Sequence, residues 1–95
     1  MPVKVMIKRT VPQYTEDDLL GMIKEMRGLT TQQPGYISGE TLKRLDRPGQ
    51  SLVISTWQSL DSWNRWFRSE DRSQIQKKID ALVGKTTEFK IYDYE

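Results

Sequence analysis

The chain has 95 residues, enough for one domain that buries about 60 to 65% of the surface exposed by the unfolded chain. Fifteen lysines and arginines against 13 aspartates and glutamates give a formal charge of +2, which argues against a dedicated nucleic-acid or membrane surface. Cysteine is absent, which excludes disulfides, thiolate nucleophiles and iron–sulfur clusters. Histidine is also absent, so the usual acid or base at neutral pH and the usual haem or metal ligand are missing.

No apolar run is long enough for a signal peptide or a membrane span, so we expect a soluble, cytoplasmic protein with no membrane partner. Aspartates and glutamates are scattered over predicted turns, caps and strand ends, and no metal site is expected. The pattern contains no internal repeat or low-complexity tract, and residues 1–95 are therefore interpreted as a single domain.

Two segments near the ends of the chain alternate in polarity. Val3, Val5 and Ile7 are each separated by one residue, which predicts a strand with one strongly buried face. The same alternation recurs over residues 86–94 and predicts a last strand, with Thr87, Phe89 and Ile91 on one side of it.

Residues 15 to 33 show the spacing of a helix. Thr15 predicts an N-cap, followed by acidic residues in the first turn. An apolar stripe then repeats at helical intervals: Leu19, Met22, Ile23 and Met26. The helix is expected to end between Gly28 and Gln33, ahead of a Pro-Gly turn.

The middle of the chain predicts a hairpin. One strand is expected from Tyr36 to Leu45, with Gly39 marking a bulge or a close approach to the backbone. A Pro-Gly turn at 46–49 leads to a strand over 52–58 that is apolar on both faces and is therefore expected to lie centrally.

Two helices are predicted after the hairpin. Ser59 is the expected N-cap of the first, whose shared face holds Leu60, Trp63, Trp66 and Phe67. Ser69 is the expected N-cap of the second, with Gly84 as its stop. The inward stripe of this second helix is expected at Ile75, Ile79 and Leu82.

The order β-α-β-β-α-β indicates an α+β, ferredoxin-like fold, an antiparallel sheet with helices on one face. The other face would carry a group of side chains that a monomer rarely leaves in water, expected to include Met6, Val53, Trp57 and Tyr92. We therefore expect a homodimer joined through its sheet faces, with Trp57 in the dimer core.

Two segments carry a family resemblance: PGYISGETL at residues 34–42 and VISTWQSLDSWNRWF at residues 53–67. In these segments and in the order of elements, the chain resembles the antibiotic biosynthesis monooxygenase (ABM) family, whose members are dimeric α+β barrels. The resemblance covers nearly the whole chain. Members include cofactor-free quinone-forming monooxygenases, haem-degrading enzymes and domains of unknown activity.

The resemblance implies a pocket between sheet and helices that contains Trp66. In haem-degrading members this Trp works with an Asn near the end of the first strand and a His on the following helix. Those positions fall here at Lys8 or Arg9 and at Gln76, so haem degradation is not expected. No cofactor is expected.

The reaction that fits these residues is cofactor-independent oxidation of a small quinol-like or polycyclic aromatic by O2. Trp66 and Arg9 are the predicted catalytic residues, with Arg9 favouring a phenolate. The predicted substrate-binding residues are Tyr36, Trp63, Phe67 and Gln76.

Two alternatives stay open. Trp63 and Phe67 suit an ordinary hydrophobic core better than a site, and Trp66 suits both, since aromatics at helical spacing are usually buried against a sheet. The whole chain also suits a non-catalytic dimeric domain that binds a small ligand or only assembles. RNA binding through the sheet is not expected, because the third strand lacks the basic, glycine-rich aromatic motif.

Overall fold

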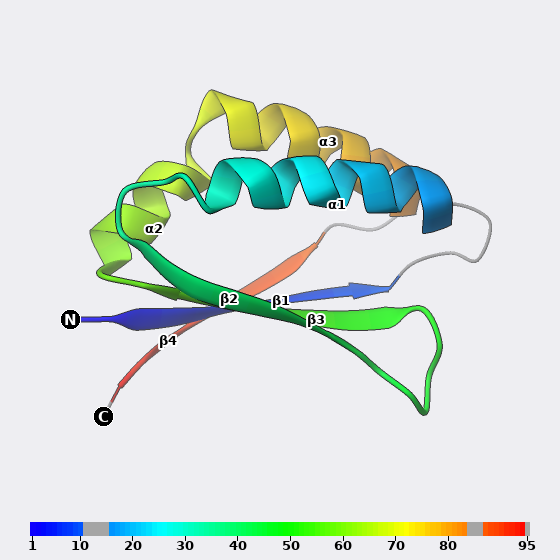
Figure 1. Ribbon diagram of the computed structural model, residues 1–95, viewed down its shortest axis with the longest axis horizontal. Helices are drawn as coiled ribbons and strands as arrows, with labels where there is room; N and C mark the ends of the chain where they lie inside the picture. The colour runs from blue at the N-terminus through cyan, green and yellow to red at the C-terminus, as the bar shows by residue number, and fades with distance from the viewer. Residues whose placement is uncertain (11–15, 84–86, 95) are drawn as a thin grey trace.

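A computed structural model describes residues 1–10, 16–83 and 87–94 of the chain. Within these residues the chain forms four antiparallel strands and three helices, which confirms the predicted ferredoxin-like order (Figure 1). The elements in chain order are β1 (Val3–Thr10), α1 (Glu16–Thr30), β2 (Tyr36–Lys43), β3 (Gln50–Trp57), α2 (Leu60–Phe67), α3 (Glu70–Val83) and β4 (Glu88–Asp93).

The sheet has the strand order β2-β3-β1-β4, and every pair is antiparallel. All three helices lie on the same face of the sheet (Figure 1). Val3 at the start of β1 lies opposite Asp93 at the end of β4, so the two ends of the chain are adjacent. The opposite face of the sheet has no helix over it within the described residues.

Local capping confirms most of the predicted helix boundaries. The Ser59 hydroxyl accepts from the Ser62 amide at 3.1 Å and starts α2, and the Ser69 hydroxyl accepts from the Arg72 amide at 3.2 Å and starts α3. Helix α1 ends at Thr30, inside the expected interval. The predicted cap Thr15 and stop Gly84 lie outside the described residues. None of the described helices has the length and apolar character to cross a membrane.

The expectation that Val53 and Trp57 lie on the uncovered face is wrong. The register places Val53 opposite Ile7 and Trp57 opposite Val3, on the face that the helices cover. Trp57 is 0% exposed, and its Nε1 donates to the Ser55 hydroxyl at 3.1 Å. Because β3 is apolar on both faces, its alternation alone does not say which set points to the helices. Trp57 therefore belongs to the core of the protomer.

The uncovered face carries the other set of side chains. Met6 lies opposite Ile54, and Lys4 lies opposite Tyr92, so Met6 and Tyr92 are on this face as expected. Met6 and Ile54 are half-buried, and Tyr92 is exposed.

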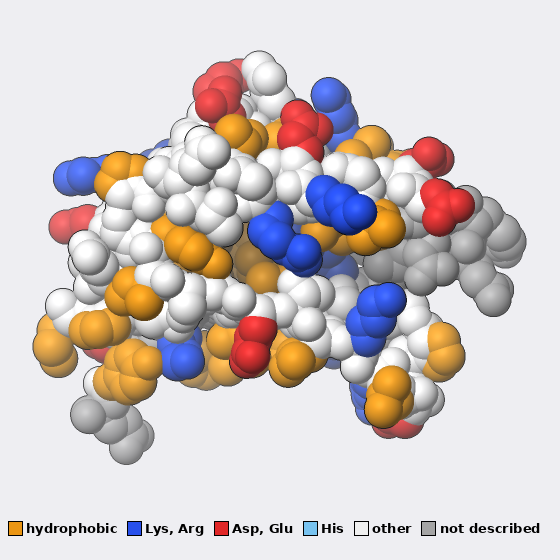
Figure 2. Space-filling view, in the orientation of Figure 1, with side chains coloured by type: hydrophobic (Ala, Val, Ile, Leu, Met, Phe, Trp, Pro, Cys, Tyr) orange, Lys and Arg blue, Asp and Glu red, His pale blue; other side chains and the backbone are white. Residues whose placement is uncertain are grey.

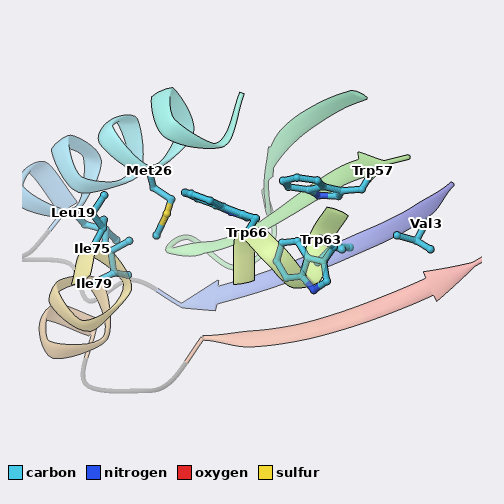
Figure 3. Packing of buried hydrophobic residues seen from close by; sticks show 9 residues of the cluster. Val3, Leu19, Met26, Trp57, Trp63, Trp66, Ile75 and Ile79 are labelled. Carbon is cyan, nitrogen blue, oxygen red and sulfur yellow. The ribbon is translucent and has the colours of Figure 1, made fainter. Parts of the chain in front are cut away.

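The buried hydrophobic side chains form one cluster, within which two groups can be distinguished (Figure 3). Leu19, Ile75 and Ile79 gather where α1 and α3 pack together. Trp57 and Trp63 gather at the other end, with ring centroids 5.6 Å apart in an edge-to-face contact. Trp66 and Met26 lie between the two groups (Figure 3).

Trp57→Ala is expected to lower the free energy of unfolding by about 3 to 5 kcal/mol, because it removes a fully buried aromatic and leaves a cavity. Leu60→Ala is the control, since Leu60 is 46% exposed and should cost under about 1 kcal/mol. Urea unfolding followed by circular dichroism at one protein concentration measures both. Equal losses in the two variants would contradict the placement of Trp57 in the core.

Candidate active site

A cavity of about 410 Å³ lies between the helix layer and the sheet. This volume is within the range of about 300 to 1,000 Å³ found for small-molecule sites. Side chains from all of the described strands and helices contribute to its wall. Figure 2 shows basic side chains along the border between the helices and the sheet, above the hollow.

One wall of the cavity is aromatic. Trp66 and Trp63 come from α2, where the Ser59 cap fixes the start of the helix, and both are buried. Tyr36 comes from the start of β2 and contacts Trp57 edge to face at 5.5 Å. The cavity therefore offers flat apolar surfaces on which an aromatic ring can pack.

Tyr36 is held by a close approach to Gly39. A Cβ at position 39 would lie 2.7 Å from the Tyr36 hydroxyl oxygen, so the glycine makes room for the phenol. The register irregularity in β2 lies between Tyr36 and Ser38. Of the two roles expected for Gly39, the structure therefore shows the close approach, and the bulge lies nearer the start of the strand.

Arg9 places a positive charge inside this cavity. Its side chain points from β1 to the helix side of the sheet and is only 7% exposed. Its Nε has no hydrogen-bond partner among the residues that the structure describes. Burial lowers the pKa of Arg9, and the carboxylate of Asp80 raises it. Burial of a charged donor without a partner is unfavourable, and a negative charge in the cavity would reduce this unfavourable energy.

Arg72 from α3 supplies a second buried cation. Its guanidinium carbon lies 4.3 Å from the ring centroid of Phe67 and 4.9 Å from that of Phe89. Its Nη1 donates to the carbonyl oxygen of Phe67 at 3.0 Å. Burial lowers the pKa of Arg72, neighbouring Arg9 lowers it further, and Asp80 raises it. The two arginines therefore share one electrostatic environment.

Asp80 is the carboxylate whose charge acts on both arginines, and its Oδ1 already accepts several hydrogen bonds. It accepts from Gln76 Nε2 at 2.9 Å, from the Thr87 amide at 3.2 Å and from the Thr87 hydroxyl at 3.1 Å. Gln76 Nε2 also lies 2.7 Å from the Thr87 hydroxyl. These bonds tie α3 to the segment that enters β4.

The rim of the cavity is polar. Arg27 Nη2 on α1 donates to the Thr41 hydroxyl on β2 at 3.0 Å, and both residues are exposed. Glu40 also lies at this rim and is exposed, but it is opposite Ile54, so its side chain points to the uncovered face of the sheet. The rim thus joins the helix layer to the edge of the sheet through one side-chain hydrogen bond.

Most of the residues predicted for the site come together around this cavity: Arg9, Tyr36, Trp63, Trp66 and Gln76. Phe67 does not lie on the wall. It is 40% exposed and instead contacts Arg72 and Phe89, because it follows the cavity-lining Trp66 by one residue and points to another side of α2.

The sequence reasoning missed Arg72. A signal was present, because Arg72 precedes Ile75 by three residues and Ile79 by seven, which places it on the inward stripe of α3. Arginine on such a stripe is easily taken for a solvated residue, since basic residues usually face water.

Among the described residues no group of three or more His, Cys, Asp or Glu side chains could hold a metal ion.

The fold and the cavity define a small ferredoxin-like domain with an aromatic, cationic pocket. The family model for antibiotic biosynthesis monooxygenase matches residues 2–78. The chain therefore belongs to the antibiotic biosynthesis monooxygenase family, as the resemblance in the sequence indicated.

Two curated proteins match the chain at low sequence identity. The chain is 25% identical over 84 residues to protein SchA of Streptomyces halstedii and 23% identical over 84 residues to a 42.8 kDa protein in the whiE locus of Streptomyces coelicolor. These matches cover 88% of this chain but only 22% and 21% of the relatives, so the chain spans about a fifth of their length.

Solved structures share the fold. A conserved protein from Methanosarcina mazei superposes with a TM-score of 0.92 at 20% identity, covering 100% of this chain and 94% of that one. SnoaB, a cofactor-independent oxygenase from Streptomyces nogalater, superposes with a TM-score of 0.86 at 17% identity, covering 99% of this chain and 93% of that one.

Arg9→Met is expected to leave the free energy of unfolding unchanged or to raise it by up to about 4 kcal/mol, because it replaces a buried, incompletely bonded cation with an apolar side chain. Arg72→Met is the matched comparison and should lose about 1 to 3 kcal/mol, since Arg72 donates to a backbone carbonyl and packs on two rings. Chemical denaturation measures both. A loss above about 1 kcal/mol in Arg9→Met would show that Arg9 stabilises the fold.

Proposed function

We propose that the cavity is the active site of a cofactor-independent monooxygenase that oxidises a small quinol-like or polycyclic aromatic with O2. The observation that carries this proposal is the juxtaposition of an unsatisfied buried cation, Arg9, with the aromatic surfaces of Trp66 and Trp63. Such a site favours a flat substrate whose reactive form is an anion.

The reaction needs little from the protein besides this environment. Loss of a hydroxyl proton to solvent gives an electron-rich anion, which transfers one electron to O2 to form a substrate radical and superoxide. The two radicals combine at a ring carbon that carries hydrogen, the resulting peroxide anion takes a proton from solvent, and the hydroperoxide loses water to leave a carbonyl. One oxygen atom enters the product and the other leaves as water, and the substrate carbon supplies all of the electrons.

Each predicted residue on the cavity wall has a role in this scheme. Trp66 and Trp63 hold the ring, and their bulk limits the access of water to the radical pair. Tyr36, anchored over Gly39, donates to a substrate oxygen. Arg9 lowers the pKa of the substrate hydroxyl by favouring its anion. Gln76 positions the site, because its amide already bonds to Asp80 and Thr87.

The relatives support this choice at the level of the fold. SnoaB is a cofactor-independent oxygenase, and its chain superposes over nearly the whole of this one. The family model is that of antibiotic biosynthesis monooxygenases.

A non-catalytic ligand-binding domain is the second candidate. It is favoured by the lack of an available proton acceptor among the described residues at the cavity. Glu40 lies opposite Ile54 and points to the other face of the sheet, and Asp80, the carboxylate that acts on Arg9, already accepts three hydrogen bonds. Such a domain would bind the same flat ligand and release it unchanged.

Metal-free protein is expected to accelerate O2 consumption by at least one member of a panel of anthrones and dihydroxynaphthalenes. Arg9→Ala should lower kcat/KM about 100-fold, as loss of a charge-stabilising donor does in other enzymes. Trp66→Phe should lower it several-fold, since a smaller ring stacks less well. An oxygen electrode measures the rates, with circular dichroism to check folding.

Arg65→Ala is the control, because Arg65 is an exposed residue on α2. Its activity should equal that of the unaltered protein. Consumption no faster than the uncatalysed rate across the panel, together with binding of the same compounds, would favour the non-catalytic domain. Activity that survives in both site variants would place the chemistry elsewhere.

We further propose that two copies pack through the uncovered faces of their sheets. Three half-buried apolar side chains lie on this face, Met6, Leu52 and Ile54, each on a central strand. Charged side chains of both signs surround them, with Glu40 beside Ile54 and Lys90 beside Met6. An apolar centre with a charged border is typical of an interface between subunits.

Ile54→Asp should convert this dimer to a monomer, because it places a charge at the centre of the contact and next to Glu40. Light scattering coupled to size-exclusion chromatography measures the mass. Leu20→Asp is the control, since Leu20 is 51% exposed on α1, away from this face. A mass that is the same for all three proteins would argue against the contact.

A further inference from the structure

We propose that the cavity binds its ligand as a preformed organic anion, with a planar oxyanion against Arg9 and Arg72 beside it. The oxyanion would be a carboxylate or the enolate of an acidic hydroxyquinone, on a flat apolar body that lies along Trp66. This inference rests on the proposed function in using the same cavity, and it names the chemical class of the substrate.

The first argument is the balance of charge. Arg9 and Arg72 are both buried, and both have Asp80 as their favourable charged neighbour. The pair therefore has one more positive charge than Asp80 offsets. At the exposed rim Arg27 adds a positive charge that solvent screens, whereas Glu40 lies opposite Ile54 and points to the other face of the sheet. A ligand with one negative charge offsets the excess at the two buried arginines.

The second argument is that Asp80 does not pair directly with either cation. In the described residues, the ion pair within 4.0 Å is that of Arg44 with Asp46, at the exposed end of the hairpin. Asp80 Oδ1 instead accepts from Gln76 and twice from Thr87. This carboxylate is committed to holding α3 and the start of β4 together, which leaves the arginines available to a ligand.

The third argument is geometric. Arg72 is fixed by the rings of Phe67 and Phe89 and by its bond to a carbonyl. Arg9 is buried at the wall with its Nε unpaired among the described residues. A guanidinium presents its N–H groups as a planar fork that matches two oxygens of one planar anion. A neutral hydroxyl or carbonyl matches the fork less well and does not offset its charge.

The apolar wall decides between an inorganic and an organic anion. Trp66, Trp63 and Phe89 line the cavity together with aliphatic side chains from β1, α1 and β3. A free phosphate or sulfate would leave these surfaces in contact with water. A fused-ring body covers them and brings its oxyanion to the arginines.

Binding of matched pairs of probes tests the proposal, measured by isothermal titration calorimetry at one neutral pH. The pairs are 1-naphthoate with 1-naphthamide, and the 2-hydroxy-1,4-naphthoquinone anion with 2-methoxy-1,4-naphthoquinone. Each anion is expected to bind at least about tenfold more tightly than its neutral partner, the lower end of what a charge-assisted hydrogen bond contributes. A preference in only one pair would identify that oxyanion as the one recognised.

Arg9→Gln and Arg72→Gln should each reduce the preference for the anion at least about fivefold, whereas Arg65→Gln on the exposed side of α2 should leave it unchanged. Circular dichroism verifies that the variants are folded. Equal affinity for anion and neutral partner in both pairs would overturn the proposal, and so would a preference that persists in both site variants. None of the probes needs to react, so the two proposals can fail separately. If the protein prefers the anions but consumes no O2, the proposed oxygenase function is rejected and the proposed anion site is retained.

Discussion

Two guanidinium groups, those of Arg9 and Arg72, are buried between the sheet and the helices, and the arrangement of the cavity depends on them. Charged groups seldom leave water without a partner of opposite charge, and here the electrostatics of Arg9 and of Arg72 involve the same carboxylate, Asp80. The neighbouring structure limits the unfavourable energy. The rings of Phe67 and Phe89 pack against the Arg72 guanidinium. Three hydrogen bonds to Oδ1 of Asp80 hold this carboxylate in place, and its negative charge acts on both arginines. Arg9, whose Nε stays without a partner among the described residues, lies in the wall of the cavity.

This arrangement explains why a space remains beside the hydrophobic core. A domain of 95 residues has little apolar surface to spare, yet a cavity of about 410 Å³ lies between its helix layer and its sheet. Filling that space with side chains would add stability through burial and packing. The cavity therefore lowers the free energy of unfolding relative to a filled core, at the position where a ligand would bind, as is common for binding sites.

Periodicity and capping residues were sufficient to predict the order of elements, and Ser59 and Ser69 start their helices as expected. The side of the sheet that Trp57 faces could not be predicted, because β3 is apolar on both faces and only its register with β1 decides the matter. Arg72 was missed because its burial depends on Phe67 and Phe89, which meet only in the folded chain. For the site, the sequence was sufficient to predict most of the aromatic residues on the cavity wall. It was not sufficient to predict the charge balance of Arg9, Arg72 and Asp80, because these residues become neighbours only in the folded chain.

The hydrogen bond between Arg27 and Thr41 has a consequence for the speed of ligand entry. It links α1 to β2 across the rim, and both of its side chains are exposed, so its net contribution is on the order of 1 kcal/mol. Rotation of an exposed arginine side chain takes picoseconds to nanoseconds, far less than the movement of a helix. Opening this link needs only such a rotation, so the link itself would add no slow step to the passage of a ligand across this part of the rim.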